Sequence, residues 1–585
     1  MRAHQNWIFG LVLIVATLLA YQPAWRGKLI WDDDLYLKRS HARSLFQIWT
    51  EPKTTQQYHP LVDTVFWVED KLWNGSLLGH HLFNILIHAC SALLLFKILR
   101  QLDVPGSWLA AGIFALHPVQ VESVAWLVEL KNTLSGFLFF AAMLAYLRFD
   151  RTRSKIFYAL VLVLFGLGLA TKTIIALLPV AVLIVIWWRR GRLQWKSDLP
   201  PLVPFAAIGV LAGFVTAWME RKFSGAEGAE FQLSALERLL IAGRAFWFYL
   251  AKLFWPVELV LIYPRWSVSS SQWWQYIFLA AAFLLFVALW RWRSRNRAPF
   301  AGLFFFAALL FPMLGFFNVY YFRFSFVADH FQYLPSVGIF TLVSAAAGLV
   351  LGNAGGWQRR VGYSICGAIL ILLGTLTWRQ SHLYQNAETA FRDVVSKNPG
   401  SPTGHNNLGD ALAEKGALDA AITEFQRTLE LEPDYTLANY NLGAALLGKG
   451  DAEAAIPHFR LVLNHDPNHA MAYYNLANAL SAVGRTDEAI RCYERAIKLD
   501  PNFMGSHSNL GNAFLEKGDL EAAMSQYQRA VELEPKNPMC HYNLAVGFAR
   551  ANRIDQAEAE LNTVLRLRPD YPDAKELLSD LKRQR

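Results

Sequence analysis

Three consecutive carboxylates, Asp32, Asp33 and Asp34, follow the first apolar segment of the chain by only a few residues. Adjacent carboxylates repel one another, and beside a membrane surface they are costly unless a cation, a proton or a substrate interacts with them. A carboxylate next to a hydroxyl group can take its proton while a new bond forms, which is general-base chemistry. The run is therefore the first catalytic candidate, and a solvated loop that merely ends the first helix is the alternative.

Isolated charges at the ends of later apolar runs could bind an anionic substrate. Lys172 is the only charge in a long apolar run with a basic cluster at each end, and such a lysine is costly without an anionic partner. Snorkelling of Lys172 to lipid headgroups is the alternative. Arg323 and His330 are further candidates for a phosphate site, with interfacial anchoring as their alternative. Glu122 and Lys131 share another polar tip, where they could bind donor sugar or phosphate or pair with each other.

The cysteines and acidic residues give no metal-ligand pattern. The four cysteines, Cys90, Cys366, Cys492 and Cys540, have neither the spacing of a zinc site nor that of a disulfide framework. We predict no metal site, although the three aspartates could hold a divalent ion.

The composition is that of a membrane protein with a second, polar part. Of 585 residues, 54% are hydrophobic and only 17% are charged, and nearly all long apolar runs lie before Trp378. The chain is too long for a single soluble core. A net charge of +9 would suggest nucleic acid as a partner of a soluble protein, but here many basic residues stand in short turns between apolar runs. They report membrane topology, and we expect no nucleic acid partner.

The apolar runs predict eleven membrane spans, with a signal anchor as the first. The predicted spans are residues 7–25, 81–99, 107–125, 132–149, 156–171, 174–188, 200–218, 273–291, 299–317, 334–352 and 361–378. Basic clusters between spans should face the cytoplasm. Residues 236–255 carry four charges, so we interpret them as an amphipathic or re-entrant segment. Counting spans then places the aspartate run, the polar tips and the chain after Trp378 together on the non-cytoplasmic side.

The last third of the chain repeats with a period of 34 residues. An Asn-Leu-Gly or Asn-Leu-Ala motif begins at Asn407, Asn441, Asn475, Asn509 and Asn543. This period with small residues two positions later is the tetratricopeptide signature. We predict a membrane domain over 1–378, a connecting half-repeat over 379–400, five repeats over 401–570 and a capping helix over 571–585. The asparagine row is a candidate for binding the backbone of an extended acceptor peptide, and capping or bridging of neighbouring helices is the alternative.

Several motifs together resemble the transmembrane and tetratricopeptide-repeat protein O-mannosyltransferases, which belong to the GT-C class of membrane glycosyltransferases. They are GKLIWDDD, HPVQVESVAWLVELKNTLS, ATKTIIALLP, YLAKLFWPVELVLIYP and FVADHFQYLPSVG, followed by the repeats. The resemblance implies an all-α fold, a polytopic helical bundle followed by a solenoid. It also implies a donor sugar on a polyprenyl phosphate and a catalytic carboxylate in the first outer loop. Relatives show two adjacent acids where this chain has three, and often Arg where this chain has His330.

The function that this resemblance implies is transfer of a sugar, mannose in this family, to Ser or Thr hydroxyls of acceptor proteins. Asp32 or Asp33 would be the base, and a single base without a covalent carrier implies inversion at the sugar carbon. The implied location is a bacterial inner membrane with the site on the periplasmic side, or the lumenal side of the endoplasmic reticulum. A non-enzymatic membrane-anchored scaffold and an oligosaccharide transferase or polymerase are the alternatives.

Overall fold

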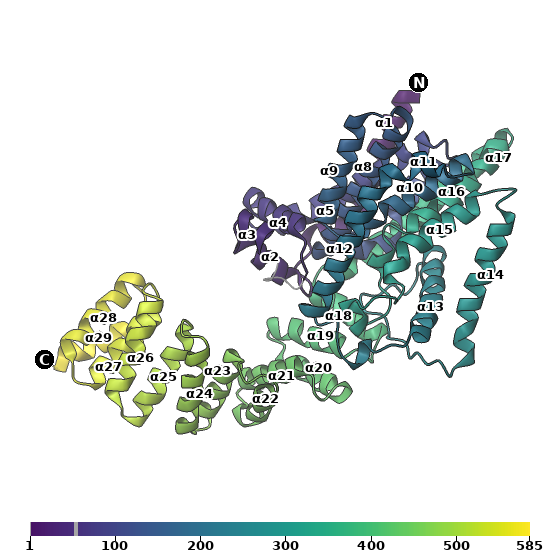
Figure 1. Cartoon of the computed structure of the whole chain (residues 1–585). Helices are drawn as coiled ribbons and strands as arrows, with labels where there is room; N and C mark the ends of the chain where they lie inside the picture. Colours follow the sequence, from purple (N-terminus) through teal and green to yellow (C-terminus); the bar gives the residue numbers. More distant parts are fainter. Residues whose placement is uncertain (1, 52–56, 585) are drawn as a thin grey trace. The chain divides into compact units, whose positions relative to one another are not determined.

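The computed structural model describes residues 2–51 and 57–584, and every regular element in these residues is a helix. The predicted all-α class is therefore confirmed. The chain forms two compact units, one up to Gly404 and one from His405 onward. The segment 379–400, predicted as a connecting half-repeat, thus belongs to the first unit. Figure 1 colours the chain from its N-terminus in purple to its C-terminus in yellow.

The first unit is a bundle of helices that differ widely in length. Its α-helices are α1 (Arg2–Ala20), α2 (Asp33–His41), α3 (Leu45–Thr50), α4 (Pro60–Trp73), α5 (Leu77–Gln101), α6 (Ser107–Leu116), α7 (Val121–Ala125), α8 (Leu130–Thr152), α9 (Lys155–Leu169), α10 (Leu178–Arg190), α11 (Trp195–Asp198), α12 (Val203–Lys222), α13 (Ala235–Phe254), α14 (Tyr276–Trp292), α15 (Ala298–Leu310), α16 (Ser336–Asn353), α17 (Gly356–Ser381) and α18 (Ala387–Lys397). At its centre α5 packs against α6 and α8, and α16 packs against α6 and α15.

Within the ranges that the structure describes, seven helical stretches are long and apolar enough to cross a membrane. They are Leu77–Gln101, Leu127–Thr152, Thr173–Arg190, Trp195–Lys222, Trp273–Trp292, Ser336–Asn353 and Gly356–Tyr384. Four shorter apolar helices overlap the other four predicted spans: Trp7–Ala20, Ser107–Leu116, Lys155–Leu169 and Ala298–Met313. The count of eleven spans stays a prediction. The charged helix α13, which lies beside α14 (Figure 1), is not among these candidates.

The predicted span 107–125 is wrong as one continuous helix. Helix α6 ends at Leu116, and His117 takes an extended conformation with ψ of 129°. The physical reason is Pro118, because the proline ring disfavours a helical conformation of the residue before it. A 3-10 turn, Pro118–Gln120, and the short helix α7 follow, and both are buried. The irregular backbone brings polar residues into the bundle at this point.

The second unit consists of antiparallel helix pairs. The helices are α19 (Pro402–Glu414), α20 (Leu418–Leu431), α21 (Thr436–Lys449), α22 (Ala452–His465), α23 (Ala470–Ala482), α24 (Thr486–Leu499), α25 (Met504–Lys517), α26 (Leu520–Leu533), α27 (Pro538–Arg550), α28 (Ile554–Leu567) and α29 (Pro572–Gln584). At Gly443 a β-carbon would lie 2.9 Å from the ring of Phe459, which is fully buried. The small residue therefore lets the two helices of that repeat pack closely.

Candidate active site

Asp33 has a structural role in the turn that begins α2. Its two carboxylate oxygens accept hydrogen bonds from the backbone N–H groups of Ile30, at 2.8 Å, and of Val128, at 2.9 Å. The side chain is only 2% exposed, and burial raises the pKa of Asp33, as does the charge of Asp32 beside it. With both oxygens in use, Asp33 ties the segment between α1 and α2 to the segment before α8.

The other two aspartates differ sharply in their surroundings. Asp34 makes an exposed ion pair with Lys38, at 2.6 Å, and such surface pairs contribute little. Asp32 is half-buried, and its Oδ1 has no hydrogen-bond partner among the described residues. Burial raises the pKa of Asp32 to about 6, and the charge of Lys131 opposes this shift. A carboxylate with such a pKa suits a general base near neutral pH.

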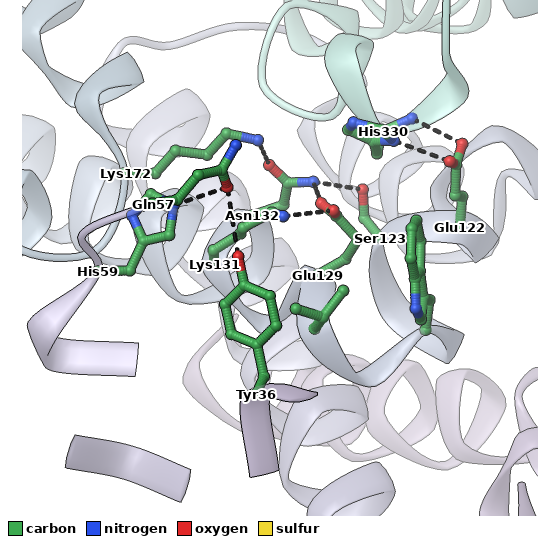
Figure 2. Close-up of polar contacts among 12 residues, drawn as sticks. Tyr36, Gln57, His59, Glu122, Ser123, Glu129, Lys131, Asn132, Lys172 and His330 are labelled. Atoms are coloured by element: carbon green, nitrogen blue, oxygen red, sulfur yellow. Dashed lines mark hydrogen bonds and ion pairs between the residues drawn. The ribbon is translucent and has the colours of Figure 1, made fainter. Parts of the chain in front are cut away.

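Figure 2 shows a hydrogen-bonded network of Lys131, Glu129, Asn132, Ser123 and Lys172. It lies close to Asp32, because the charges of Lys131 and Glu129 both act on the pKa of that carboxyl. The Lys131 ammonium is 2.9 Å from Glu129, so this lysine is neutralised by a direct ion pair. The Asn132 amide nitrogen donates to Glu129 and to the Ser123 hydroxyl, and its oxygen accepts from the Lys172 ammonium.

Lys172 therefore differs from Lys131, because its recorded side-chain contact is a neutral amide oxygen. No carboxylate lies within ion-pair distance of its ammonium among the described residues. Burial lowers the pKa of Lys172 to about 8. The group keeps N–H donors that could bind a phosphate oxygen.

His330 and Glu122 form a second buried pair. The His330 Nδ1 is 2.8 Å from one Glu122 oxygen, and the His330 backbone N–H donates to the other at 3.1 Å (Figure 2). Glu122 therefore pairs with His330, and Lys131 pairs with Glu129, so the alternative in which Glu122 pairs with Lys131 is wrong. The tertiary fold is the reason, because 208 residues separate Glu122 and His330.

Arg323 is the one predicted cation that the structure does not bring into this cluster. Its side chain is 49% exposed and lies 3.9 Å from Glu230. No contact between Arg323 and the network around Asn132 is recorded in the described part of the chain.

Several residues of the site were not singled out from the sequence. Tyr36 donates to the Gln57 amide oxygen at 3.4 Å, and the Gln57 amide nitrogen donates to Glu220 at 2.9 Å. Glu129 and Asn132 flank Lys131 within a motif already quoted for the family. The signal for Glu220 was a lone acid at the end of an apolar run, the same signal that identified Lys172.

The asparagine row of the repeats bridges neighbouring helices. Asn441 donates to Asn406, Asn475 to the Tyr440 hydroxyl, Asn509 to the Tyr474 hydroxyl, and Asn543 to Ser508. Each bond reaches the first helix of the preceding repeat. One amide N–H of each of these residues is thus already used, and peptide binding by the row stays a prediction.

Among residues 2–51 and 57–584 no group of three or more His, Cys, Asp or Glu side chains is arranged to hold a metal ion. The polar cluster contains carboxylate, amide, hydroxyl and ammonium groups.

Comparison with known proteins adds matches for both units. Residues 58–219 match the family model described as dolichyl-phosphate-mannose-protein mannosyltransferase. Residues 409–450, 434–502, 474–538 and 514–581 match tetratricopeptide-repeat models.

Three curated relatives are named protein O-mannosyl-transferases. A protein O-mannosyl-transferase of Caenorhabditis elegans is 23% identical over 445 residues, which cover 72% of this chain and 62% of the relative. Protein O-mannosyl-transferase TMTC4 of Mus musculus is 24% identical over 71% of this chain and 65% of its own length. TMTC3 of Mus musculus is 31% identical over 21% of this chain and 14% of its length. The chain covers less than two thirds of the length of each of these relatives.

Proposed function

Because the chain resembles the TMTC protein O-mannosyl-transferases in its membrane unit and in its repeats, we propose that it transfers mannose to Ser or Thr hydroxyls of acceptor proteins. One observation carries the proposal. The segment that matches the mannosyltransferase model contributes Lys131, Asn132 and Lys172, and beside them Asp32 has a buried oxygen without a hydrogen-bond partner among the described residues.

The donor that fits these side chains is a sugar on a polyprenyl phosphate. Such a donor is an anion whose phosphate leaves with additional negative charge, so a cation near the leaving oxygen stabilises the transition state. Lys172 supplies that cation, because Lys131 is already neutralised by Glu129. His330, held by Glu122, is the second candidate for contact with the donor phosphate.

The reaction then requires one proton transfer. Asp32 takes the proton of the acceptor hydroxyl while the oxygen of that hydroxyl bonds to the sugar carbon. At the same time the bond from this carbon to the phosphate oxygen breaks. The polyprenyl phosphate leaves with the electron pair of that bond. Since no covalent sugar intermediate is needed, the configuration at the sugar carbon inverts.

The repeats and the site share the non-cytoplasmic side of the membrane in this proposal, and the repeats bind acceptor proteins. The basic turns between apolar runs support this orientation. A reporter enzyme that is active only outside the cytoplasm, fused to the C-terminus of the full chain, should be active. Activity of a cytoplasmic reporter at the same position would contradict this orientation.

The test of the function is a transfer assay with the full-length protein in lipid nanodiscs. The substrates are mannose on a polyprenyl phosphate and an unfolded acceptor protein, and the product is an acceptor with hexose on Ser or Thr. Asp34→Asn is the matched control for Asp32→Asn, because Asp34 is a surface residue of the same run. An acceptor that binds but receives no sugar would favour the scaffold alternative.

A further inference from the structure

Trp31, the residue before the aspartate run, has a backbone conformation that is unusual for its type. Its φ is +52°, in the left-handed region. Arg153 and Glu258 also have positive φ, as do Asn74, Asp103 and Asn552, whose residue types tolerate this region. A bulky side chain does not, and such conformations persist only where the surrounding structure enforces them, often at functional sites.

The indole of Trp31 is held by three other aromatic side chains. It stacks on Trp126 with ring centroids 5.8 Å apart and planes at 7°. The edges of Phe324 and Phe391 meet it at 5.4 Å and 5.9 Å. Aromatic pairs in these geometries contribute beyond the area that they bury. The three partners come from widely separated parts of the chain, so they fix the indole in space.

Phe391 belongs to α18, the helix that resembles the second helix of a repeat. It is 1% exposed. Around it, the Lys28 N–H donates to the Gln385 carbonyl at 2.8 Å, and the Asn398 amide donates to the Ile262 carbonyl at 3.2 Å. The residues that flank helix α18 are therefore attached to the segment between α1 and α2 and to the loop between α13 and α14.

From these contacts we propose that Trp31 is a positioning residue for Asp32, and that α18 is part of the catalytic unit because it holds Trp31 in place. The inference rests on the proposed function for its catalytic consequence. The left-handed turn at Trp31 is closed by hydrogen bonds from Asp33 N to Ile30 O and from Tyr36 N to Asp32 O. If the indole loses its support, the turn relaxes and the Asp32 carboxylate moves away from its neighbours.

The pH profile separates positioning from a general loss of structure. The charged or titratable groups that act on Asp32 are Asp33, Tyr36, Arg39, Glu129 and Lys131. Burial is the largest influence on Asp32 and raises its pKa. A relaxed turn lets water reach the carboxylate, so the acid limb of the activity profile should move to lower pH.

The variants are made in the full-length protein. Phe391→Ala removes one ring from Trp31, and Val394→Ala is the matched control, since Val394 is fully buried on the same helix and faces Gly404. We expect Phe391→Ala to lower kcat by roughly tenfold to a hundredfold, with little change in donor KM and with the acid limb shifted down. Trp31→Asn permits the left-handed backbone but removes the ring, and it should be equally impaired, whereas Trp31→Phe should keep most activity.

Amide hydrogen exchange gives a readout that does not depend on activity. Residues 28–36 should exchange faster in Phe391→Ala than in the parent or in Val394→Ala. Unchanged exchange, or equal kcat in Phe391→Ala and Val394→Ala, would overturn the inference. If the parent protein transfers no mannose, the proposed function fails on its own, and the exchange rates still decide whether α18 holds the turn.

Discussion

In the repeat unit several asparagine and histidine side chains bond polar groups of neighbouring helices, whereas in the membrane unit Asp32 Oδ1 is buried without a hydrogen-bond partner among the described residues. Asn475 bonds Tyr440, and His541 lies 2.6 Å from Glu560 within one repeat. In the membrane unit, Glu122, Glu129 and His330 are all nearly inaccessible to solvent. Buried charges and orphaned acceptors lower stability, so their concentration in one unit indicates function there. The same residue types stabilise one unit and form the candidate site in the other.

The largest effects should come from substitution of Asp32 and Asp33. Asp32→Asn keeps size and polarity but removes the base, so transfer should fall by about 10²-fold or more while the protein still folds. Asp33→Asn places an amide NH2 group against one of the two backbone N–H groups of Ile30 and Val128, so its main effect should be a lower yield of folded protein. Transfer assays and size-exclusion profiles of both variants check this. Full activity of Asp32→Asn would show that another group is the base.

The second comparison makes one substitution in each unit. Lys172→Ala should raise the donor KM by roughly tenfold or more, because it removes the cation expected at the phosphate. Lys449→Ala is the control, since Lys449 lies on the surface of the repeats and pairs with Asp419. Steady-state kinetics with the donor and the acceptor varied separately distinguish the two. An effect of Lys172→Ala confined to the acceptor KM would place the phosphate elsewhere.

A smaller, several-fold change in kcat/KM is expected when the pH is varied. Asp32 must be ionised to accept a proton, so kcat/KM should rise as the pH increases through about 6, the pKa to which burial raises this group. Lys172 must be protonated to bind phosphate, so kcat/KM should fall as the pH increases through about 8. Lys172→Arg should remove the alkaline limb, because arginine stays charged. An alkaline limb unchanged in Lys172→Arg would assign it to another group.

The smallest effect concerns the asparagine row. Asn475→Ala breaks the bond to Tyr440 and should lower the free energy of unfolding of the repeat unit by about 0.5–1.5 kcal/mol. Urea unfolding of the unit from His405 measures this, with the exposed Asn464→Ala as control. The triple variant of Asn441, Asn475 and Asn509 then tests binding. Unchanged acceptor affinity at matched folding would show that the row is only structural.

The sequence by itself determined that the chain combines apolar membrane helices with tetratricopeptide repeats, and it indicated the region of the candidate site. Long apolar runs predict burial in lipid, and a 34-residue period with small residues predicts stacked helix pairs. Neither prediction needs information about residues that are distant in the sequence. Lone charges such as Lys172 were visible for the same reason, because each is conspicuous in its local context.

Only the tertiary structure decided which carboxylate is available and which charges are already paired. The Asp33 carboxylate accepts a hydrogen bond from Val128, which is 95 residues away in the sequence. Glu122 pairs with His330, which is 208 residues away. Three adjacent aspartates have nearly the same local sequence, so nothing local distinguishes Asp32 from its neighbours. Hydrogen bonds and burial depend on groups that the fold brings together across the chain, and these contacts separate a structural carboxylate from a candidate base.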